Sequence, residues 1–291
     1  MGRALAEAHP EAMAVWDEAD KVLGIPVKET AWNGPDEALT RTDMAQPALL
    51  TAGVAALRVV EGLGFNPRSA AGHSLGEYSA LVACASLKFS SALRLVRIRG
   101  EAMQAAAEAA GGGMAAVLGA DVDALEQLCR EIGGIAPANI NAPGQVVVSG
   151  TDEGLTALES RAKEIKARRV VRLNVAGPFH SPAMAPAAEA VAEALQTVTV
   201  ENPVSPVYAN VTARQELTAA EVRANLVAQI TGRVRWLETV QNMVSDGNTR
   251  FVELGPGNVL AGLVRRIAPE VEMFSVGDPE SLAAFREAVK V

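Results

Sequence analysis

Helical periodicity alternates with short β-rich runs along most of this chain. In the helical segments apolar residues recur every three or four positions, whereas the short runs gather apolar and β-branched residues. This alternation predicts an α/β protein with a mostly parallel sheet covered by helices. The predicted helices span residues 10–23, 46–62, 75–86, 90–109, 122–132, 152–167, 182–196, 219–230, 236–245 and 258–267. The predicted strands span residues 68–71, 113–118, 145–149, 169–174, 205–209, 249–253 and 272–275.

One internal segment has a different order of elements. After the glycines at 111–113 the pattern reads strand, helix, strand, strand, helix, strand, which is the order of a ferredoxin-like unit. Glycines lie at both ends of the segment, the second end being Gly177. The sequence therefore predicts a small subdomain, residues 110–176, inserted into a larger domain formed by residues 1–109 and 177–291.

Composition excludes several classes of protein. With 49% hydrophobic residues among 291, the chain can bury a large core. A net charge of −8 argues against nucleic acid as a partner, because binding phosphates requires a basic face. No apolar stretch is long enough to span a bilayer, and no leader opens the chain, so we expect no membrane association and a cytoplasmic protein. Cys84 and Cys129 have no metal-binding spacing and are expected to be reduced core residues.

The segment Gly72-His73-Ser74-Leu75-Gly76 fits the pattern of a nucleophile elbow. Glycines two positions either side of a serine relieve the crowding of a sharp strand-to-helix turn. There Ser74 would lie at a helix N-terminus, and the Leu75 N–H could donate to an oxyanion. The alternative is an unreactive serine that caps the helix. The strand-like run before it and the helical run after it favour the elbow.

A serine nucleophile needs a base, and the chain has three histidines. His9 precedes Pro10 at a helix start and is expected on the surface. His73 adjoins the serine and, pointing another way on a tight turn, is expected to line the site. His180 follows a strand and a Gly-Pro turn, which makes it the best candidate for the base. No acidic residue stands out to orient its imidazole, so a backbone carbonyl and a carboxylate remain open.

Three arginines follow on the next predicted helix. Arg94, Arg97 and Arg99 cannot all face the core, and the simplest interpretation is that at least two extend to solvent. One buried near Ser74 would instead offer a planar, two-pronged grip on a substrate carboxylate.

Five motifs in order along the chain carry a family resemblance. They are "TDMAQPALL" (42–50), "GHSLGEYSAL" (72–81), the arginine of "RLVRIRG" (94–100), "GPFHS" (177–181) and "FVELGPGNVLAGL" (251–263). Together they resemble the malonyl-CoA:acyl carrier protein transacylases, acyltransferases of fatty acid and polyketide synthesis. The resemblance implies an α/β-hydrolase-like catalytic domain with an inserted ferredoxin-like subdomain.

The resemblance also implies a ping-pong reaction. Ser74 would attack the thioester of malonyl-CoA with His180 as base, and the phosphopantetheine thiol of acyl carrier protein would then take the malonyl group. No bound cofactor is implied. The two partners are acyl carrier protein and the coenzyme A thioester.

Further residues acquire roles by matching the family. Arg99 matches the arginine that pairs with the malonyl carboxylate, and Gln229 matches the residue whose backbone carbonyl orients the histidine. Phe179 resembles the form of the family that selects malonyl groups. His73 and Gln46 complete the expected substrate-binding residues.

One departure from the family lies at the start of the chain. Family members begin with a strand and a "PGQGSQ"-like loop whose glutamine N–H is a second oxyanion donor. Met1 and Gly2 align just after that loop, so this donor is expected to be missing. Two alternatives to the transacylase remain: a serine esterase or thioesterase, which shares the elbow but would not need Arg99, and, because of the missing loop, an inactive module that binds carrier protein. A polyketide synthase domain is a close variant, and we expect a free-standing enzyme.

Basic residues are concentrated in one segment of this acidic chain. Residues 161–172 hold six basic side chains and one acidic one, Glu164. A solvated helix face is the simplest interpretation. Alternatively, this segment contributes, with Arg265 and Arg266, to docking the acidic carrier protein.

Overall fold

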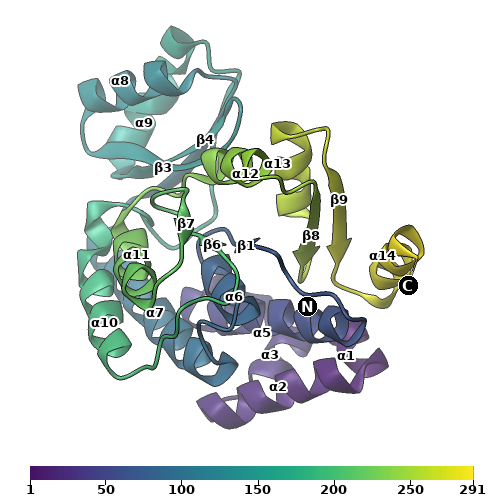
Figure 1. The fold of residues 1–291 in the computed structure, drawn as a ribbon. Helices are drawn as coiled ribbons and strands as arrows, with labels where there is room; N and C mark the ends of the chain where they lie inside the picture. The colour runs from purple at the N-terminus through teal and green to yellow at the C-terminus, as the bar shows by residue number, and fades with distance from the viewer. Residues whose placement is uncertain (291) are drawn as a thin grey trace.

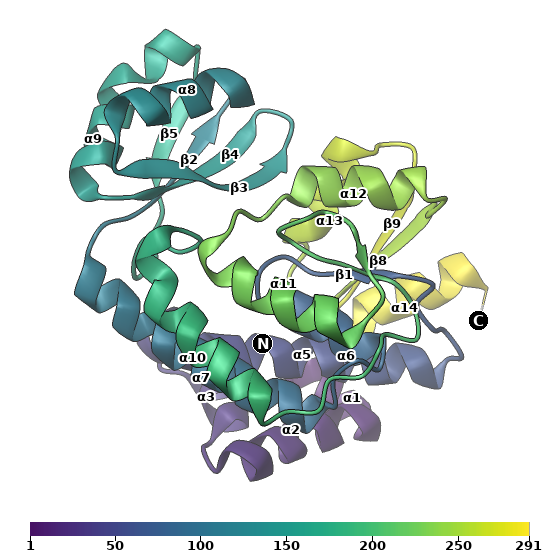
Figure 2. The same cartoon turned by 60° about the vertical axis from the view of Figure 1, so that its left-hand side comes forward.

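The computed structural model describes residues 1–290, apart from the side chain of Asp36. Helices cover three groups of short strands (Figures 1 and 2). The α-helices are α1 Arg3–Ala8, α2 Pro10–Leu23, α3 Val27–Asn33, α4 Asp36–Thr40, α5 Thr42–Gly62, α6 Gly76–Ala83, α7 Phe89–Ala110, α8 Val122–Ile132, α9 Asp152–Arg161, α10 Ala185–Gln196, α11 Ala219–Thr231, α12 Trp236–Ser245, α13 Val259–Ile267 and α14 Pro279–Val289. The strands are β1 Ala70–Ala71, β2 Gly113–Leu118, β3 Ile135–Ala142, β4 Gln145–Gly150, β5 Arg169–Arg172, β6 Val207–Tyr208, β7 Gln215–Glu216, β8 Arg250–Leu254 and β9 Glu272–Val276.

The segment from β2 to β5 forms a four-stranded antiparallel sheet in the order β3-β4-β2-β5. Helices α8 and α9 pack on the sheet, on the side away from the rest of the molecule (Figure 2). Their apolar faces and the strands bury a core of their own that includes Leu125, Val148 and Leu155. This order of elements and strands is ferredoxin-like and confirms the predicted fold class. The domain boundaries at residues 110 and 176 stay a prediction.

The larger part of the chain holds two small sheets instead of one continuous sheet. Strand β1 pairs in parallel with β6, which pairs antiparallel with β7, and β8 pairs in parallel with β9. The prediction of one mostly parallel sheet is therefore wrong for this part of the chain. Two of the three strand pairs described there, β1–β6 and β8–β9, are nevertheless parallel. Two causes keep the central strands short: β1 runs at once into the glycine turn at Gly72, and Pro206 cannot donate to a ladder.

The core of this part lies between α5 and α7, which pack closely. Gly100 permits the approach, because a Cβ there would lie 2.5 Å from the Thr42 carbonyl oxygen. Thr42 in turn donates its hydroxyl to the Gly100 carbonyl at 2.7 Å. This contact fixes the start of α5 against the middle of α7.

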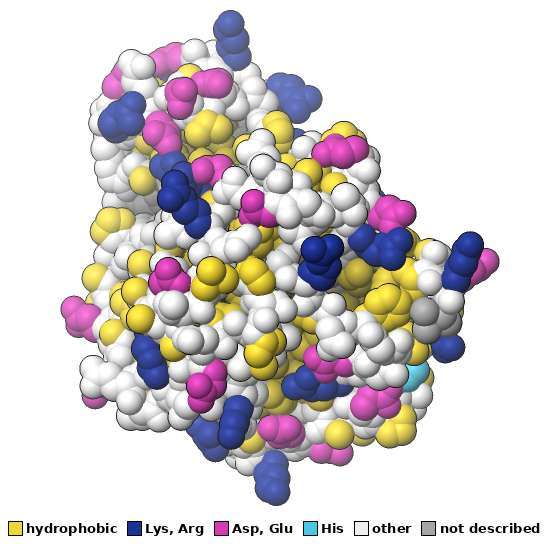
Figure 3. All heavy atoms as spheres, viewed as in Figure 1, with side chains coloured by type: hydrophobic (Ala, Val, Ile, Leu, Met, Phe, Trp, Pro, Cys, Tyr) yellow, Lys and Arg dark blue, Asp and Glu magenta, His cyan; other side chains and the backbone are white. Residues whose placement is uncertain are grey.

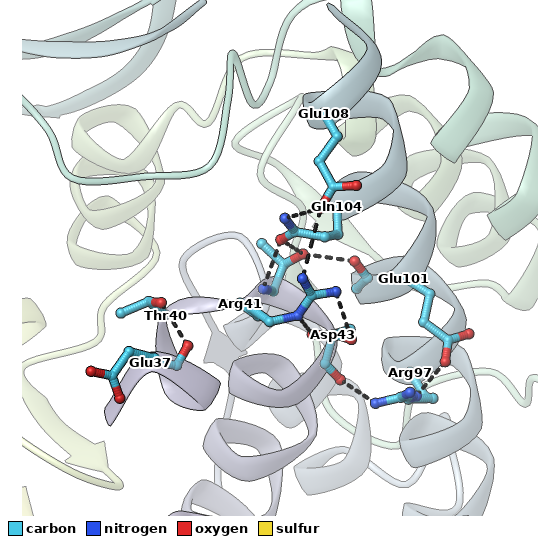
Figure 4. Close-up of polar contacts among 10 residues, drawn as sticks. Glu37, Thr40, Arg41, Asp43, Arg97, Glu101, Gln104 and Glu108 are labelled. Atoms are coloured by element: carbon cyan, nitrogen blue, oxygen red, sulfur yellow. Dashed lines mark hydrogen bonds and ion pairs between the residues drawn. The ribbon is translucent and has the colours of Figure 1, made fainter. Parts of the chain in front are cut away.

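Helix α5 begins four residues earlier than its apolar pattern predicts, and it includes Pro47. Proline has no N–H to give to the carbonyl four residues before it, which belongs to Asp43. That carbonyl accepts from Arg97 Nη1 at 2.9 Å instead (Figure 4). A side chain of α7 thus replaces the missing helical hydrogen bond and lets the helix extend to Thr42.

Other differences from the predicted elements lie mostly at the ends of the chain. Sequence periodicity missed α1, α3, α4 and α14, of which the first three are five to seven residues long. The predicted helix 152–167 ends as an α-helix at Arg161 and continues as one 3-10 turn, Ala162–Ile165. No helix among residues 1–290 is both long and apolar enough to cross a membrane.

Candidate active site

Ser74 lies on a strained turn between β1 and α6. Its φ of 51° is in the left-handed region, which is uncommon for a residue with a side chain. The turn is closed so tightly that a Cβ on Gly72 would lie 1.9 Å from the Gly76 carbonyl oxygen. Asn210 supports the strained backbone, since its Oδ1 accepts from the Ser74 N–H at 2.6 Å and its Nδ2 donates to the Gly72 carbonyl at 2.7 Å.

His180 stands beside the serine. Its Nε2 lies 2.8 Å from Ser74 Oγ, and its Nδ1 faces the backbone carbonyl oxygens of Gln229 at 2.9 Å and Gly232 at 3.2 Å. A ring nitrogen between two carbonyls carries the proton, which leaves Nε2 to accept from the serine hydroxyl. The orienting group is therefore a backbone carbonyl and not a carboxylate.

The surroundings of His180 keep its ring neutral. Burial, reinforced by the positive charge of Arg99, lowers the pKa of His180 to about 3. The side chain is almost wholly removed from water. At neutral pH the imidazole is therefore available as a proton acceptor.

Arg99 is the buried member of the three arginines, with 1% of its surface exposed. Its Nη1 donates to Gln46 Oε1 at 2.6 Å, and its Nη2 donates to Gln229 Oε1 at 2.9 Å and to Ser74 Oγ at 3.0 Å. Arg94 is exposed, as the simpler interpretation expects, whereas Arg97 is half-buried and donates to the Asp43 carbonyl of α5. A guanidinium beside a serine oxygen can stabilise negative charge there and can bind a carboxylate.

A cavity of about 420 Å³ opens above Ser74, between the ferredoxin-like sheet and the larger part of the chain. Seven of the eight predicted site residues line it, namely Gln46, His73, Ser74, Leu75, Arg99, Phe179 and His180. The eighth, Gln229, lies behind the others and touches His180, Arg99 and Ser74 through hydrogen bonds. A larger surface hollow, about 570 Å³ beside Lys21 and Arg94, is lined by no serine, cysteine or histidine.

His73 lines the cavity without contacting the serine oxygen. Its Nε2 pairs with Asn141 Oδ1 at 2.8 Å, and its ring packs against Trp236 with centroids 5.7 Å apart. Asn141 belongs to β3, so this pair joins the two parts of the molecule at the cavity wall. Burial lowers the pKa of His73.

Two buried polar residues escaped the sequence analysis. Glu77 is wholly buried, and its Oε2 accepts from the Asn210 N–H at 2.8 Å and from Gln229 Nε2 at 3.0 Å. Asn210 lies two residues after the end of β6, and ligand sites in α/β proteins gather at the carboxyl ends of strands. That rule was the available signal for Asn210, whereas the carboxylate of Glu77 gave none.

The structure describes no metal centre among residues 1–290, where no three His, Cys, Asp or Glu side chains are arranged to hold an ion. Both cysteines are free and buried. Burial raises the pKa of Cys84 to about 12 and that of Cys129 to about 11, so neither thiol is activated.

A serine held on an elbow turn, with a neutral base and an arginine beside it, is equipped for covalent acyl transfer. Comparison with known families agrees. The family model described as "Acyl transferase domain" matches residues 1–276, and the chain belongs to this acyltransferase family.

Individual relatives narrow the comparison. A malonyl CoA-acyl carrier protein transacylase of Bacillus subtilis strain 168 is 41% identical over 294 residues, covering 100% of this chain and 93% of the relative. The crystal structure of an acyl-carrier-protein-S-malonyltransferase from Bartonella henselae is 40% identical with a TM-score of 0.95, covering 100% and 95%. A malonyl-transacylase solved in complex with its type II polyketide synthase acyl-carrier protein is 38% identical with a TM-score of 0.95, covering 99% and 94%.

Proposed function

We propose that this protein transfers a malonyl group from malonyl-CoA to the phosphopantetheine thiol of acyl carrier protein. The observation that carries the proposal is the single hydrogen-bonded set of Ser74, His180 and Arg99 at the floor of one cavity. The relatives named as malonyl transacylases supply the substrate class.

The first half-reaction forms an ester on the serine. Ser74 Oγ attacks the thioester carbonyl carbon while its proton passes to His180 Nε2. The carbonyl oxygen becomes an oxyanion, and the Leu75 N–H at the start of α6 is its proposed donor. When the carbon–sulfur bond breaks, the imidazolium returns the proton to the coenzyme A sulfur, and the malonyl group stays on Ser74.

The second half-reaction repeats these steps in reverse. The carrier-protein thiol gives its proton to His180 and attacks the serine ester, and the serine oxygen leaves with the proton. Arg99 holds the malonyl carboxylate during both steps with its guanidinium. Phe179 and other apolar side chains line the cavity, and a bound acyl group packed against them leaves little room for water as the acceptor. These steps use side chains, one thioester substrate and one thiol substrate, and call for no cofactor.

The test is intact mass measurement after incubation with malonyl-CoA. We expect a gain of one malonyl group in the native protein, none in Ser74→Ala, and loss of the adduct when carrier protein bearing phosphopantetheine is added. Acetyl-CoA and methylmalonyl-CoA run in parallel measure selectivity for the carboxylate and for its branching. An adduct that persists in Ser74→Ala, or one that water removes as fast as carrier protein does, would contradict the proposal.

The docking of an acidic carrier protein by residues 161–172 also stays a proposal. Arg161 and Arg172 are already paired with carboxylates of the same unit. The remaining basic side chains there are exposed, namely Lys163, Lys166, Arg168 and Arg169. Basic and acidic side chains are mixed over this unit at the top of the space-filling view (Figure 3).

A cytoplasmic location of the protein likewise stays a prediction.

Charge reversal tests the docking proposal. Because Arg168 and Arg169 are exposed, Glu at both positions is expected to raise the KM for carrier protein about 10-fold at low salt and leave acylation by malonyl-CoA unchanged. Reversal of the exposed Arg94, on a different face, is the control. Equal KM values at low and high salt would contradict an electrostatic dock.

A further inference from the structure

Gln229 connects the groups of the active site. It is wholly buried on α11, and its backbone carbonyl accepts from His180. Its side-chain Oε1 accepts from Arg99 Nη2 at 2.9 Å, and its Nε2 donates to the Ser74 carbonyl at 3.0 Å and to Glu77 Oε2 at 3.0 Å. A carboxamide has one accepting and one donating end, so the orientation of this group decides whether Arg99 meets an oxygen or an N–H.

Glu77 is placed to set that orientation. It lies on the first turn of α6, with none of its surface exposed. Its Oε2 accepts from both Gln229 Nε2 and the Asn210 N–H, whereas within residues 1–290 its Oε1 has no hydrogen-bond partner. An acceptor at this point requires the NH₂ end of the carboxamide to face it, and Oε1 of Gln229 then faces Arg99.

Protonation of Glu77 leaves this arrangement intact. Burial raises the pKa of Glu77 to about 7. A proton on Oε1 leaves Oε2 free to accept both bonds, because both converge on that one atom. The contribution of Glu77 is thus that of an acceptor more than that of a charge.

Building on the proposed function, we propose that Glu77 is a positioning residue for carboxylate recognition: its Oε2 fixes the Gln229 carboxamide so that Arg99 is held between two carbonyl oxygens. The second of these is Gln46 Oε1, which fixes Nη1. Without Glu77, the Ser74 carbonyl is the one remaining acceptor of the Gln229 NH₂ group among the described residues, and rotation of the carboxamide turns this group toward the guanidinium. Two donors then face each other, and Arg99 loses one of its two amide anchors.

The experiment compares two substitutions of Glu77. Glu77→Met has similar length and no acceptor, whereas Glu77→Gln removes the charge but offers an amide oxygen at the same point. We expect Glu77→Met to lower the malonyl-to-acetyl ratio of kcat/KM for Ser74 acylation about 10- to 100-fold, the cost of a buried unpaired donor. Glu77→Gln is expected to restore most of that ratio.

Glu216 provides the matched control. It is another buried glutamate with an unpartnered Oε1, and its Oε2 accepts from Asn225 and not from Gln229. Glu216→Met is therefore expected to lower thermal stability but leave the malonyl-to-acetyl ratio unchanged. If Glu77→Met fails to fold, Gln229→Met removes the same carboxamide, keeps the backbone carbonyl, and is expected to lower the ratio to the same extent.

Several results would overturn the inference: an unchanged ratio in Glu77→Met or in Gln229→Met, an equal fall in Glu216→Met, or a Glu77→Gln protein as poor as Glu77→Met. Failure of the proposed function is a separate result, because the native protein would then form no malonyl adduct at all. If the native protein transfers malonyl and Glu77→Met keeps its selectivity, only the role of Glu77 is wrong.

Discussion

Removal of the Arg99 guanidinium tests the physical basis of substrate choice most directly. Arg99→Ala deletes a planar cation that is 1% exposed and reaches Ser74 Oγ at 3.0 Å. A substrate with a free carboxylate would lose its only buried positive partner among the described residues lining the cavity. A substrate with an uncharged acyl group would lose no charge partner, because only the contacts of Arg99 with Ser74, Gln46 and Gln229 would disappear.

The expected size follows from the burial. Truncating one partner of a buried, hydrogen-bonded charge pair costs about 2–5 kcal/mol. Since each 1.4 kcal/mol is tenfold in rate, kcat/KM for malonyl-CoA is expected to fall about 30- to 4,000-fold. Arg99→Lys keeps the charge but not the two-pronged geometry, so it is expected to recover only part of this loss.

The assay is the rate of Ser74 acylation by malonyl-CoA and by acetyl-CoA in the same preparation. Arg99 also anchors Gln46 and Gln229, so its removal disturbs packing for both substrates alike. The ratio of the two rates cancels that shared loss and isolates the carboxylate contact. A ratio equal to that of the native protein would refute the assignment of the carboxylate to Arg99, whatever the absolute rates.

Three further predictions concern the base, the turn and its support. NMR of labelled histidine should show His180 neutral down to pH 5, because burial lowers its pKa to about 3, and titration near 6.5 would contradict this. Since the imidazole of the unfolded chain takes up a proton below about pH 6.5, His180 makes folding less favourable as the pH falls. In chemical denaturation, Gly72→Ala should lower the free energy of unfolding by more than about 3 kcal/mol, because its Cβ would meet the Gly76 carbonyl. Gly76→Ala, whose Cβ would meet nothing within 4 Å, should change that free energy by less than about 1 kcal/mol, and equal effects would count against the tight turn. Asn210→Ala should slow Ser74 acylation about 10- to 100-fold, because it leaves the Ser74 N–H and the Gly72 carbonyl unpaired. Asn210→Asp should have an intermediate rate, because its side chain can accept but not donate, and native rates in both variants would exclude a supporting role for Asn210.

The elbow was predictable from the sequence because its causes are local. Gly72 is required by a clash within five residues, because a Cβ there would meet the Gly76 carbonyl, and the helix that follows has a clear apolar pattern of its own. The ferredoxin-like unit was predictable from the order of its elements, although two of its pairs, β2–β4 and β2–β5, join strands that are separated by other elements of the unit. The division of the larger part into two small sheets was not predictable, because the length of the central strands depends on the glycine turn at Gly72 and on Pro206.

Sequence by itself therefore predicted the candidate nucleophile, the short set of candidate bases and the order of most of the elements. Only the tertiary structure decided which arginine is buried, which carbonyl holds the histidine and what orients Gln229. The carbonyl that accepts from His180 belongs to a residue 49 positions away, and every residue has such a carbonyl, so no side-chain pattern marks it. Glu77 gave no signal either, because a carboxylate on a helix is normally solvated. Its position facing Gln229 and Asn210 follows from the packing of α6 against segments more than 130 residues later in the chain.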